Sequence, residues 1–317
     1  MNEIKKVGVI GGGQLAWMMA DAAKSLGVSL IVQTPNKNDP AVAIATETIF
    51  AAIDDAEATA ELATRSDIIT FENEFVNLDA LFPLAWQGVS FRPSLSVLTP
   101  LLDKYLQLCC LRDLGLPVPQ FAKWKAGETN SPLLSKGGGG GIFPKMVVKV
   151  RRHGYDGRGT FIVSDEAELK SLGEKLEGRS LLIQEFIPFV KELAVIAARS
   201  ASGEIAVFPV VETQQENEVC RRVIAPADIT PEVAAEVEAI ARTLLTGLNN
   251  VIGIFGIELF LTADDKLLVN EIAPRTHNSG HFTLDACETS QFEQHLRAVC
   301  GLPLGSTALK SSGAVMV

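Results

Sequence analysis

The sequence is poor in the residues that would indicate an oxidising compartment or a membrane. It contains only five cysteines and four histidines among 317 residues. The cysteine count is odd, Cys109 and Cys110 are adjacent, and no two cysteines have CxxC spacing, which excludes a disulfide framework and a CxxC metal site. No apolar run reaches the roughly 18 residues that a membrane span requires, and the first residues lead into a strand and not a signal peptide. We therefore expect a cytoplasmic protein with reduced cysteines and no membrane partner.

An excess of positive charge is also lacking. The net charge is −10 and the pI is about 5.0, which argues against a surface that coats nucleic acid. Small anionic substrates remain compatible, because a basic pocket can lie within an acidic protein. Hydrophobic residues make up 47% and charged residues 21% of the chain, as in packed globular proteins. The length suits two or three domains.

The first hundred residues alternate between short apolar strands and helices. The pattern predicts strands at 7–10, 28–32, 48–51 and 68–71, with helices at 15–26 and 56–63. Such alternation indicates a parallel sheet with helices on its faces. We assign residues 1–100 to this Rossmann-like domain. Thr99 is expected to cap the next helix, with Pro100 as its first residue.

Two further domains are predicted after it. Residues 101–187 form an α+β module, and residues 188–317 form a larger, mixed-sheet domain with a helix at 231–245 and a β-hairpin. The fold class is therefore α/β followed by α+β. The chain ends at Val317, within a segment that reads as a strand.

A glycine turn follows the first strand. Residues 11–16 satisfy the G-x-G-x-x-G/A fingerprint, so a nicotinamide-dependent Rossmann oxidoreductase is one candidate. That reading also needs an acid ending the second strand, and the next acid, Asp39, lies beyond a proline. What remains is a turn whose amides can bind an anion, such as a substrate phosphate. Glu72 and Glu74 follow the strand at 68–71, and one of them is expected to hold a substrate hydroxyl.

The strongest local signal is the segment from Lys149 to Gly159. It places three glycines among several cations between two predicted strands, so that backbone amides can close over phosphates. Because the chain returns as a strand, we interpret the segment as a phosphate lid and not a P-loop. Lys149 and Lys104 could neutralise phosphate oxygens. Asp156, the sole acid in the segment, is either an ion-pair partner or a positioned base.

Near the C-terminus two apolar strands flank a polar turn, which is typical of a β-hairpin. With the turn centred between positions 264 and 265, Glu258 faces Glu271 and Phe260 faces Val269. Carboxylates directly opposite each other are destabilising on their own. The sequence therefore predicts a divalent cation between them, and oxygen ligands suit Mg²⁺. The alternative is an ordinary hairpin with solvated glutamates.

The motifs together resemble the ATP-grasp family over essentially the whole chain. They lie at 12–15, 70–72, 103–104, 154–159, 189–193, 270–275, 277–281, 290–299 and 301–305. The run His-Asn-Ser-Gly-His at 277–281, with two of the four histidines, is especially specific. The resemblance implies an ATP-grasp fold, with an N-terminal preATP-grasp domain, an inserted lid domain and a C-terminal catalytic domain.

The resemblance also implies a C–N bond-forming ligase of de novo purine biosynthesis. ATP would phosphorylate bicarbonate to carboxyphosphate, and the amine of 5-aminoimidazole ribonucleotide would take up the carboxyl group. ATP and Mg²⁺ are the implied cofactors, and a homodimer is expected. Another ATP-grasp ribonucleotide ligase, such as a formate-dependent glycinamide ribonucleotide transformylase, is the alternative within the family.

Site residues follow from the resemblance, position by position. ATP contacts are implied for Lys104, Lys149, Gly154, Tyr155, Asp156, Gly157, Arg158, Gly159, Thr160, Gln184, Glu185, Phe186, Ile187, Glu192, Asn270 and Glu271. Mg²⁺ is implied at Glu258 and Glu271. The substrates would meet Gly13, Gln14, Leu15, Glu72, Asp156, Arg275 and His277, and the catalytic residues would be Asp156, Arg275 and His277.

The chain departs from the family pattern in a few places. Ala16 and Trp17 stand where Gly-Arg is usual, and Gln215 stands where a histidine is usual, which weakens an implied nucleotide contact. Relatives continue beyond the position of Val317 into a small subdomain that supplies basic residues for the ribonucleotide phosphate. We expect this chain to lack that subdomain.

Overall fold

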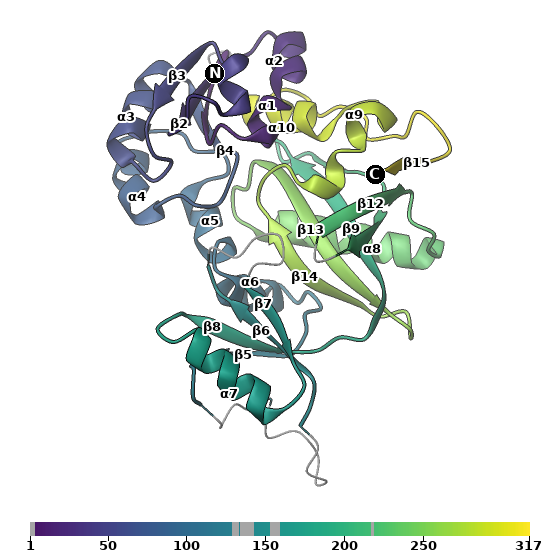
Figure 1. Ribbon diagram of the computed structural model, residues 1–317. Coiled ribbons are helices and arrows are strands. Elements are labelled where there is room, and N and C mark those ends of the chain that lie inside the picture. Colours follow the sequence, from purple (N-terminus) through teal and green to yellow (C-terminus); the bar gives the residue numbers. More distant parts are fainter. Residues whose placement is uncertain (1–3, 129–132, 134–142, 153–158, 217–218) are drawn as a thin grey trace.

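The computed structural model describes residues 4–317 apart from 129–132, 134–142, 153–158 and 217–218. The described residues contain three sheets. The N-terminal sheet lies at the top of the view in Figure 1, a small sheet lies at the bottom, and the largest sheet lies between them. Among the described residues, no helix is both long and apolar enough to cross a membrane.

The N-terminal sheet is parallel, as predicted. Its strands are β1 (Lys6–Ile10), β2 (Ser29–Thr34), β3 (Glu47–Phe50) and β4 (Ile68–Phe71), in the order β3-β2-β1-β4. Its helical segments are α1 (Gln14–Trp17), α2 (Ala20–Leu26), η1 (Pro40–Ala43), α3 (Ala56–Arg65) and α4 (Leu78–Trp86). The helix predicted at 15–26 is split, because the Met19 N–H bonds the carbonyl of Ala16, three positions back and not four. Gly27, with φ +65°, ends α2 as expected.

The helix predicted to begin after Thr99 begins elsewhere. Thr99 and Pro100 lie inside α5 (Leu95–Leu101), where the Thr99 hydroxyl donates to the carbonyl of Leu95. The next helix, α6 (Lys104–Asp113), is capped by Asp103, whose carboxylate accepts the N–H groups of the first turn. The predicted cap is therefore wrong, because an aspartate four residues later supplies a stronger one.

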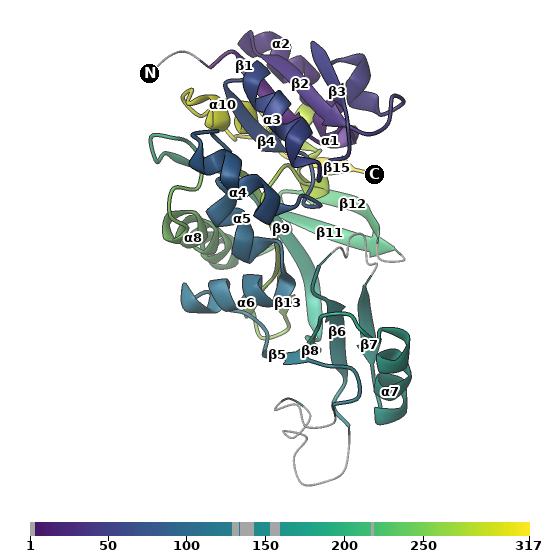
Figure 2. The same ribbon diagram turned by 90° about the vertical axis from the view of Figure 1, so that its left-hand side faces the viewer.

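The small sheet is antiparallel, in the order β5-β8-β6-β7. Its strands are β5 (Phe121–Trp124), β6 (Met146–Val150), β7 (Thr160–Val163) and β8 (Leu181–Glu185). Helix α7 (Glu166–Lys175), capped by Asp165, covers one face (Figure 2). Its Leu169 and Leu172 pack against Trp124 and Val148 of the sheet.

The largest sheet runs β14-β13-β9-β11-β12-β15, with β10 beside β9. Its strands are β9 (Phe189–Arg199), β10 (Ile205–Val207), β11 (Val211–Glu216), β12 (Val219–Ala225), β13 (Gly253–Thr262), β14 (Leu267–Ala273) and β15 (Ala314–Met316); the remaining helical segments are α8 (Pro231–Gly247), η2 (Asn278–Gly280), α9 (Thr283–Ala286) and α10 (Gln291–Cys300). We expected a mixed sheet, but every described strand pair in it is antiparallel. Short connections join β9 to β10, β11 to β12 and β13 to β14, and such connections require antiparallel pairing. The β13–β9 and β12–β15 pairs are antiparallel although long segments of chain separate their strands.

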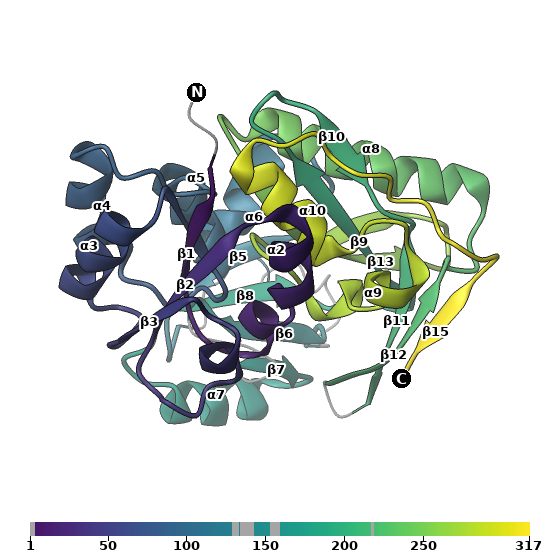
Figure 3. The same ribbon diagram turned by 90° about the horizontal axis from the view of Figure 1, so that it is seen from above.

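Helix α10 joins the N-terminal and largest sheets into one body. It lies between them when the molecule is seen from above (Figure 3). Phe292 and Leu296 belong to the core of the N-terminal sheet, and His295 Nε2 lies 2.9 Å from Thr70 Oγ1 on β4. The ends of β1 and β4 are thereby fixed relative to β13.

Gln107 ties α6 to the edge strand β14. It is 3% exposed. Its Nε2 donates to the carbonyls of Leu101 and Ile272, and its Oε1 accepts the Ile272 N–H, each at 2.8 Å. The strand that carries Glu271 is therefore held to α6 by side-chain hydrogen bonds on its outer edge.

We predict that Gln107→Leu, a substitution of similar volume, destabilises the protein. It leaves buried backbone groups of Ile272 without these partners, so the free energy of unfolding should fall by about 2–4 kcal/mol. Urea unfolding measures the change, and Gln87→Leu at the exposed end of α4 is the control. A loss within about 0.5 kcal/mol of the control would contradict the prediction.

Candidate active site

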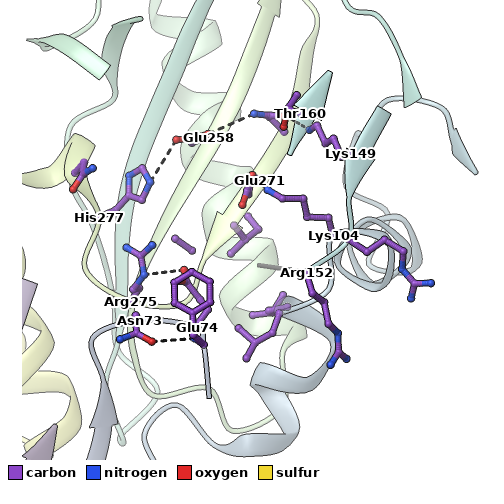
Figure 4. A pocket seen from close by; sticks show the side chains of 18 of the residues that line it. Asn73, Glu74, Lys104, Lys149, Arg152, Thr160, Glu258, Glu271, Arg275 and His277 are labelled. Atoms are coloured by element: carbon purple, nitrogen blue, oxygen red, sulfur yellow. Dashed lines mark hydrogen bonds and ion pairs between the residues drawn. The ribbon is translucent and has the colours of Figure 1, made fainter. Parts of the chain in front are cut away.

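A cleft of about 790 Å³ opens where the three sheets meet. Figure 4 shows the side chains that point into it. Among the predicted site residues, those that line it are Leu15, Glu72, Lys104, Lys149, Thr160, Gln184, Phe186, Ile187, Glu192, Glu258, Asn270, Glu271, Arg275 and His277. Groups that are distant in the sequence are thus brought to one cavity.

The predicted acidic pair is present on the β13–β14 hairpin. Glu258 lies opposite Glu271, as expected, but Phe260 pairs with Leu268 and not with Val269. The register shifts by one residue between Glu258 and Leu259, which leaves Asn270 as an extra residue on β14. Such a bulge re-aims side chains. Asn270 and Glu271, although consecutive, therefore both face the cleft.

Two lysines meet this pair from other elements. Lys104, at the start of α6, forms an ion pair with Glu271. Lys149, on β6, donates a hydrogen bond of 2.8 Å to Asn270 Oδ1, and Asn270 Nδ2 in turn donates to Glu258 Oε2 at 3.4 Å. Figure 4 shows Lys104 pointing toward Glu271, with Glu258 and Lys149 close by. The result is a compact network of two carboxylates, two ammonium groups and an amide.

The pKa values of the network show that its positive charges do not compensate both carboxylates equally. Burial, with the negative charge of Glu271 added, raises the pKa of Glu258 to about 7. Burial alone would also raise the pKa of Glu271, but Lys104 and Lys149 lower it below its usual range. Burial, with Lys104 nearby, lowers the pKa of Lys149 to about 8. Glu258 is therefore the carboxylate whose charge the protein compensates least.

The donor set fits Mg²⁺ bound together with phosphates. In the described part of the chain, no group of three or more His, Cys, Asp or Glu side chains could hold a metal. Mg²⁺ is commonly bound through one or two carboxylates together with substrate phosphates. Glu258 and Glu271, with the amide of Asn270, offer that number and kind of oxygen ligand.

The residues predicted for adenine lie along one wall of the cleft. Gln184 is 2% exposed, and its Oε1 is buried with no hydrogen-bond partner among the described residues. An amino group of a ligand could supply that partner. Phe186 and Ile187 line the same wall. Glu185 instead accepts the N–H of Gln120 at 2.7 Å, and its side chain is not part of the described cleft lining.

Glu192 lies on the same side, on β9. Burial, with Glu258 nearby, raises the pKa of Glu192 to about 7, although Gln215 donates a hydrogen bond to it. Gln215 itself lines the cleft. Gln215, which stands where the family usually has a histidine, thus contacts Glu192, the predicted ribose ligand.

On the opposite side, Glu72 at the end of β4 packs against the glycine turn. A Cβ added at Gly13 would lie 2.4 Å from Glu72 Oε1, and one added at Gly11, where φ is +112°, would lie 2.4 Å from Glu72 Oε2. Only glycine allows this approach. Leu15 lines the cleft, whereas Gly13 and Gln14 lie beside it at the start of α1.

Arg275 and His277 lie between these two sides. The Nε of Arg275 is 2.8 Å from Glu74 Oε1, an ion pair that joins the loop after β14 to the end of β4. The Nε2 of His277 is 3.4 Å from Glu258 Oε1, and its Nδ1 is 2.8 Å from Ser279 Oγ. Arg275 therefore contacts the end of the N-terminal sheet, and His277 contacts the acidic pair.

Sequence reasoning missed two residues of this region. Glu74 was considered only as a ligand for a hydroxyl, and its pairing with Arg275 was not foreseen. Gln291 was missed entirely: its amide accepts the His277 N–H at 3.0 Å and donates to the His277 carbonyl at 2.8 Å. The only signal was its place in the motif at 290–299.

Part of the predicted lid lies outside the described residues: Gly154, Tyr155, Asp156, Gly157 and Arg158. The segment's flanks are described. The carbonyl of Gly159 accepts the N–H of Val150 at 2.7 Å, and Lys149 pairs with Thr160 across antiparallel strands. The predicted return of the chain as a strand is confirmed.

We predict that Glu258 makes the metal-free protein less stable as the pH rises. Its pKa is about 7 in the folded protein and 4.5 as the unperturbed value, so between these values the folded state binds more protons and loses stability with rising pH. Relative to wild type, Glu258→Gln should become progressively more stable from pH 5 to pH 8.

Urea unfolding in EDTA measures this difference. Glu236→Gln, on the exposed face of α8, is the control for the loss of a carboxylate. A constant difference between Glu258→Gln and wild type over this pH range would contradict the prediction.

The chain is similar to known proteins in both sequence and structure. Residues 4–99 match the ribonucleotide synthetase preATP-grasp domain, and residues 109–292 match the ATP-grasp domain. The chain is 57% identical to N5-carboxyaminoimidazole ribonucleotide synthase of Synechococcus elongatus, an alignment that covers 100% of this chain and 78% of the relative.

Solved structures are similar over the whole chain. The N5-carboxyaminoimidazole ribonucleotide synthetase from Thermotoga maritima has a TM-score of 0.87 at 40% identity, with 99% of this chain and 80% of that chain covered. The synthase from Aspergillus clavatus, in complex with ADP and 5-aminoimidazole ribonucleotide, has a TM-score of 0.88 at 30% identity, with 98% and 81% covered. These matches agree with the architecture predicted from the motifs. The chain belongs to the ATP-grasp family.

Proposed function

We propose that this protein is a ligase that uses ATP and bicarbonate to carboxylate 5-aminoimidazole ribonucleotide, giving N5-carboxyaminoimidazole ribonucleotide in purine biosynthesis. The observation that carries the proposal is the convergence of two carboxylates and two lysines in one cleft with Arg275, His277 and the end of β4. The names of the relatives support the reaction, and the complex of one relative supports the ribonucleotide as substrate.

In the proposed mechanism, Lys104 and Lys149 bind the phosphates of ATP. Mg²⁺, when bound at Glu258 and Glu271, neutralises phosphate charge. An oxygen of bicarbonate attacks the γ-phosphorus, ADP leaves, and carboxyphosphate forms. Arg275 and His277 hold this anion, a role that fixed cationic and hydrogen-bonding groups perform well.

The second step forms the C–N bond. The exocyclic amine of the ribonucleotide attacks the carboxyl carbon, either of carboxyphosphate or of carbon dioxide released from it in the site. The C–O bond to phosphate breaks, phosphate leaves, and the amine loses a proton. We propose Asp156 as the group that takes or positions this proton, with Gly13, Gln14, Leu15 and Glu72 holding the ribonucleotide.

The remaining roles belong to the same proposal. The segment Gly154–Thr160 covers the phosphates, the segment Gln184–Ile187 holds adenine, and Glu192 binds the ribose of ATP. A cytoplasmic homodimer is proposed from the family resemblance. The match of residues 4–99 to a preATP-grasp model removes support from the oxidoreductase alternative.

We predict bicarbonate-dependent ADP release that rises when 5-aminoimidazole ribonucleotide is added, with N5-carboxyaminoimidazole ribonucleotide found as product by mass spectrometry. Formate in place of bicarbonate should give no stimulation. Formate-stimulated ADP release, or ADP release that does not rise with the aminoimidazole ribonucleotide, would contradict this proposal.

We also predict that Glu271→Gln lowers ADP release at least about 100-fold, because it removes one of two acidic ligands and the partner of Lys104. A circular dichroism spectrum like that of wild type would exclude unfolding as the cause. Glu236→Gln serves again as control. Unchanged turnover in Glu271→Gln would refute the metal assignment.

A further inference from the structure

The two lysines of the cleft come from separate elements and repel each other. Lys104 is the first residue of α6, and Lys149 lies near the end of β6. The positive charge of Lys104, after burial, contributes to the lowered pKa of Lys149. Both must nevertheless face Glu271 and Asn270 at once. The N-terminal end of α6 and the C-terminal end of β6 therefore need a link that holds the two lysines in place against this repulsion.

Asp103, which the proposed reaction does not use, supplies such a link. Its side chain is 4% exposed. Besides capping α6, it accepts a bidentate pair from Arg151, with Nε 3.0 Å from Oδ1 and Nη2 2.8 Å from Oδ2. Arg152 adds a longer contact of 3.4 Å to Oδ2. Bidentate arginine–carboxylate pairs are both strong and geometrically specific.

Arg151 directly follows β6, and both its backbone carbonyl and its guanidinium contact α6. Its carbonyl accepts the N–H of Lys104 at 2.9 Å. Its guanidinium lies 5.2 Å from the centre of the Tyr105 ring, a cation–π contact on the same helix. The helix end that bears Lys104 and the strand end that bears Lys149 are thus joined through one arginine.

We propose that Asp103 is a positioning residue for the nucleotide: by clamping Arg151 it fixes α6 against β6 and holds Lys104 and Lys149 at the spacing that a single polyphosphate can bridge. Asp103 does not line the cleft, whereas both lysines and Arg151 do. The proposal rests on the proposed function in one respect, that the ligand is ATP or ADP.

Asparagine separates the two roles of Asp103. Asn and Asp cap helices about equally well, so Asp103→Asn keeps the cap on α6. The neutral amide cannot accept a bidentate, charge-assisted pair from Arg151. Asp165→Asn is the matched control, because Asp165 caps α7 in the same way, through the Glu168 N–H at 2.8 Å.

The experiment is calorimetric titration of ADP with Mg²⁺ into wild type, Asp103→Asn, Arg151→Gln, the double variant and Asp165→Asn. We expect the Kd for ADP to rise about tenfold in each clamp variant, equivalent to about 1.4 kcal/mol, with no further rise in the double variant. Asp165→Asn should bind like wild type. In turnover, the KM for ATP should rise while kcat and the KM for bicarbonate stay unchanged.

The outcomes are distinct. A Kd for ADP within twofold of wild type in Asp103→Asn overturns the clamp, even if urea unfolding shows lower stability, since that is what a merely structural aspartate would give. A double variant in which the two losses add also overturns it, because Arg151 would then bind the nucleotide independently of Asp103. Wild-type protein that binds no ADP overturns the proposed function and the clamp together.

Discussion

The structure depends on the repulsion between Glu258 and Glu271, two carboxylates held opposite each other on one hairpin. Their charges would interact weakly in water but strongly in a cleft of lower dielectric constant. The fold offsets this repulsion with ammonium groups from two other elements, Lys104 of α6 and Lys149 of β6. These charge contacts bring the largest sheet, α6 and the small sheet together at this point.

The two lysines do not compensate the charges of the two carboxylates equally. Burial, with the charge of Glu271 added, raises the pKa of Glu258 to about 7, whereas Lys104 and Lys149 lower the pKa of Glu271. In the proposed function, a bound cation would complete the compensation on the carboxylate side, and phosphates would complete it on the lysine side. The network therefore suits a metal-bound polyphosphate better than either component alone. Arg275 lines the same cleft and forms an ion pair with Glu74 beyond the end of β4.

Sequence reasoning found the acidic pair through two offsets that cancel. The turn is centred on position 264, with Asp265 in the left-handed region, half a residue earlier than predicted. The bulge at Asn270 then restores the predicted partner of Glu258. Sequence alone could not place the bulge, because the alternation of apolar and polar residues does not reveal an added residue. The sequence also offered Thr99 as a helix cap, and only the structure shows that Asp103 caps α6 and also binds Arg151.

By itself, the sequence determined the four strands of the N-terminal sheet, the glycine turn after β1 and the presence of the β13–β14 hairpin. The bulge at Asn270, which puts both glutamates on one face of that hairpin, was decided by the structure. Only the tertiary structure decided that Lys104 reaches Glu271, 167 positions away, and that Lys149 reaches Asn270, 121 positions away. It also decided that Glu74 meets Arg275 and that α10 completes the N-terminal core. The physical reason is range: periodicity and capping depend on neighbours along the chain, whereas the distances between these charges are set by how whole elements pack.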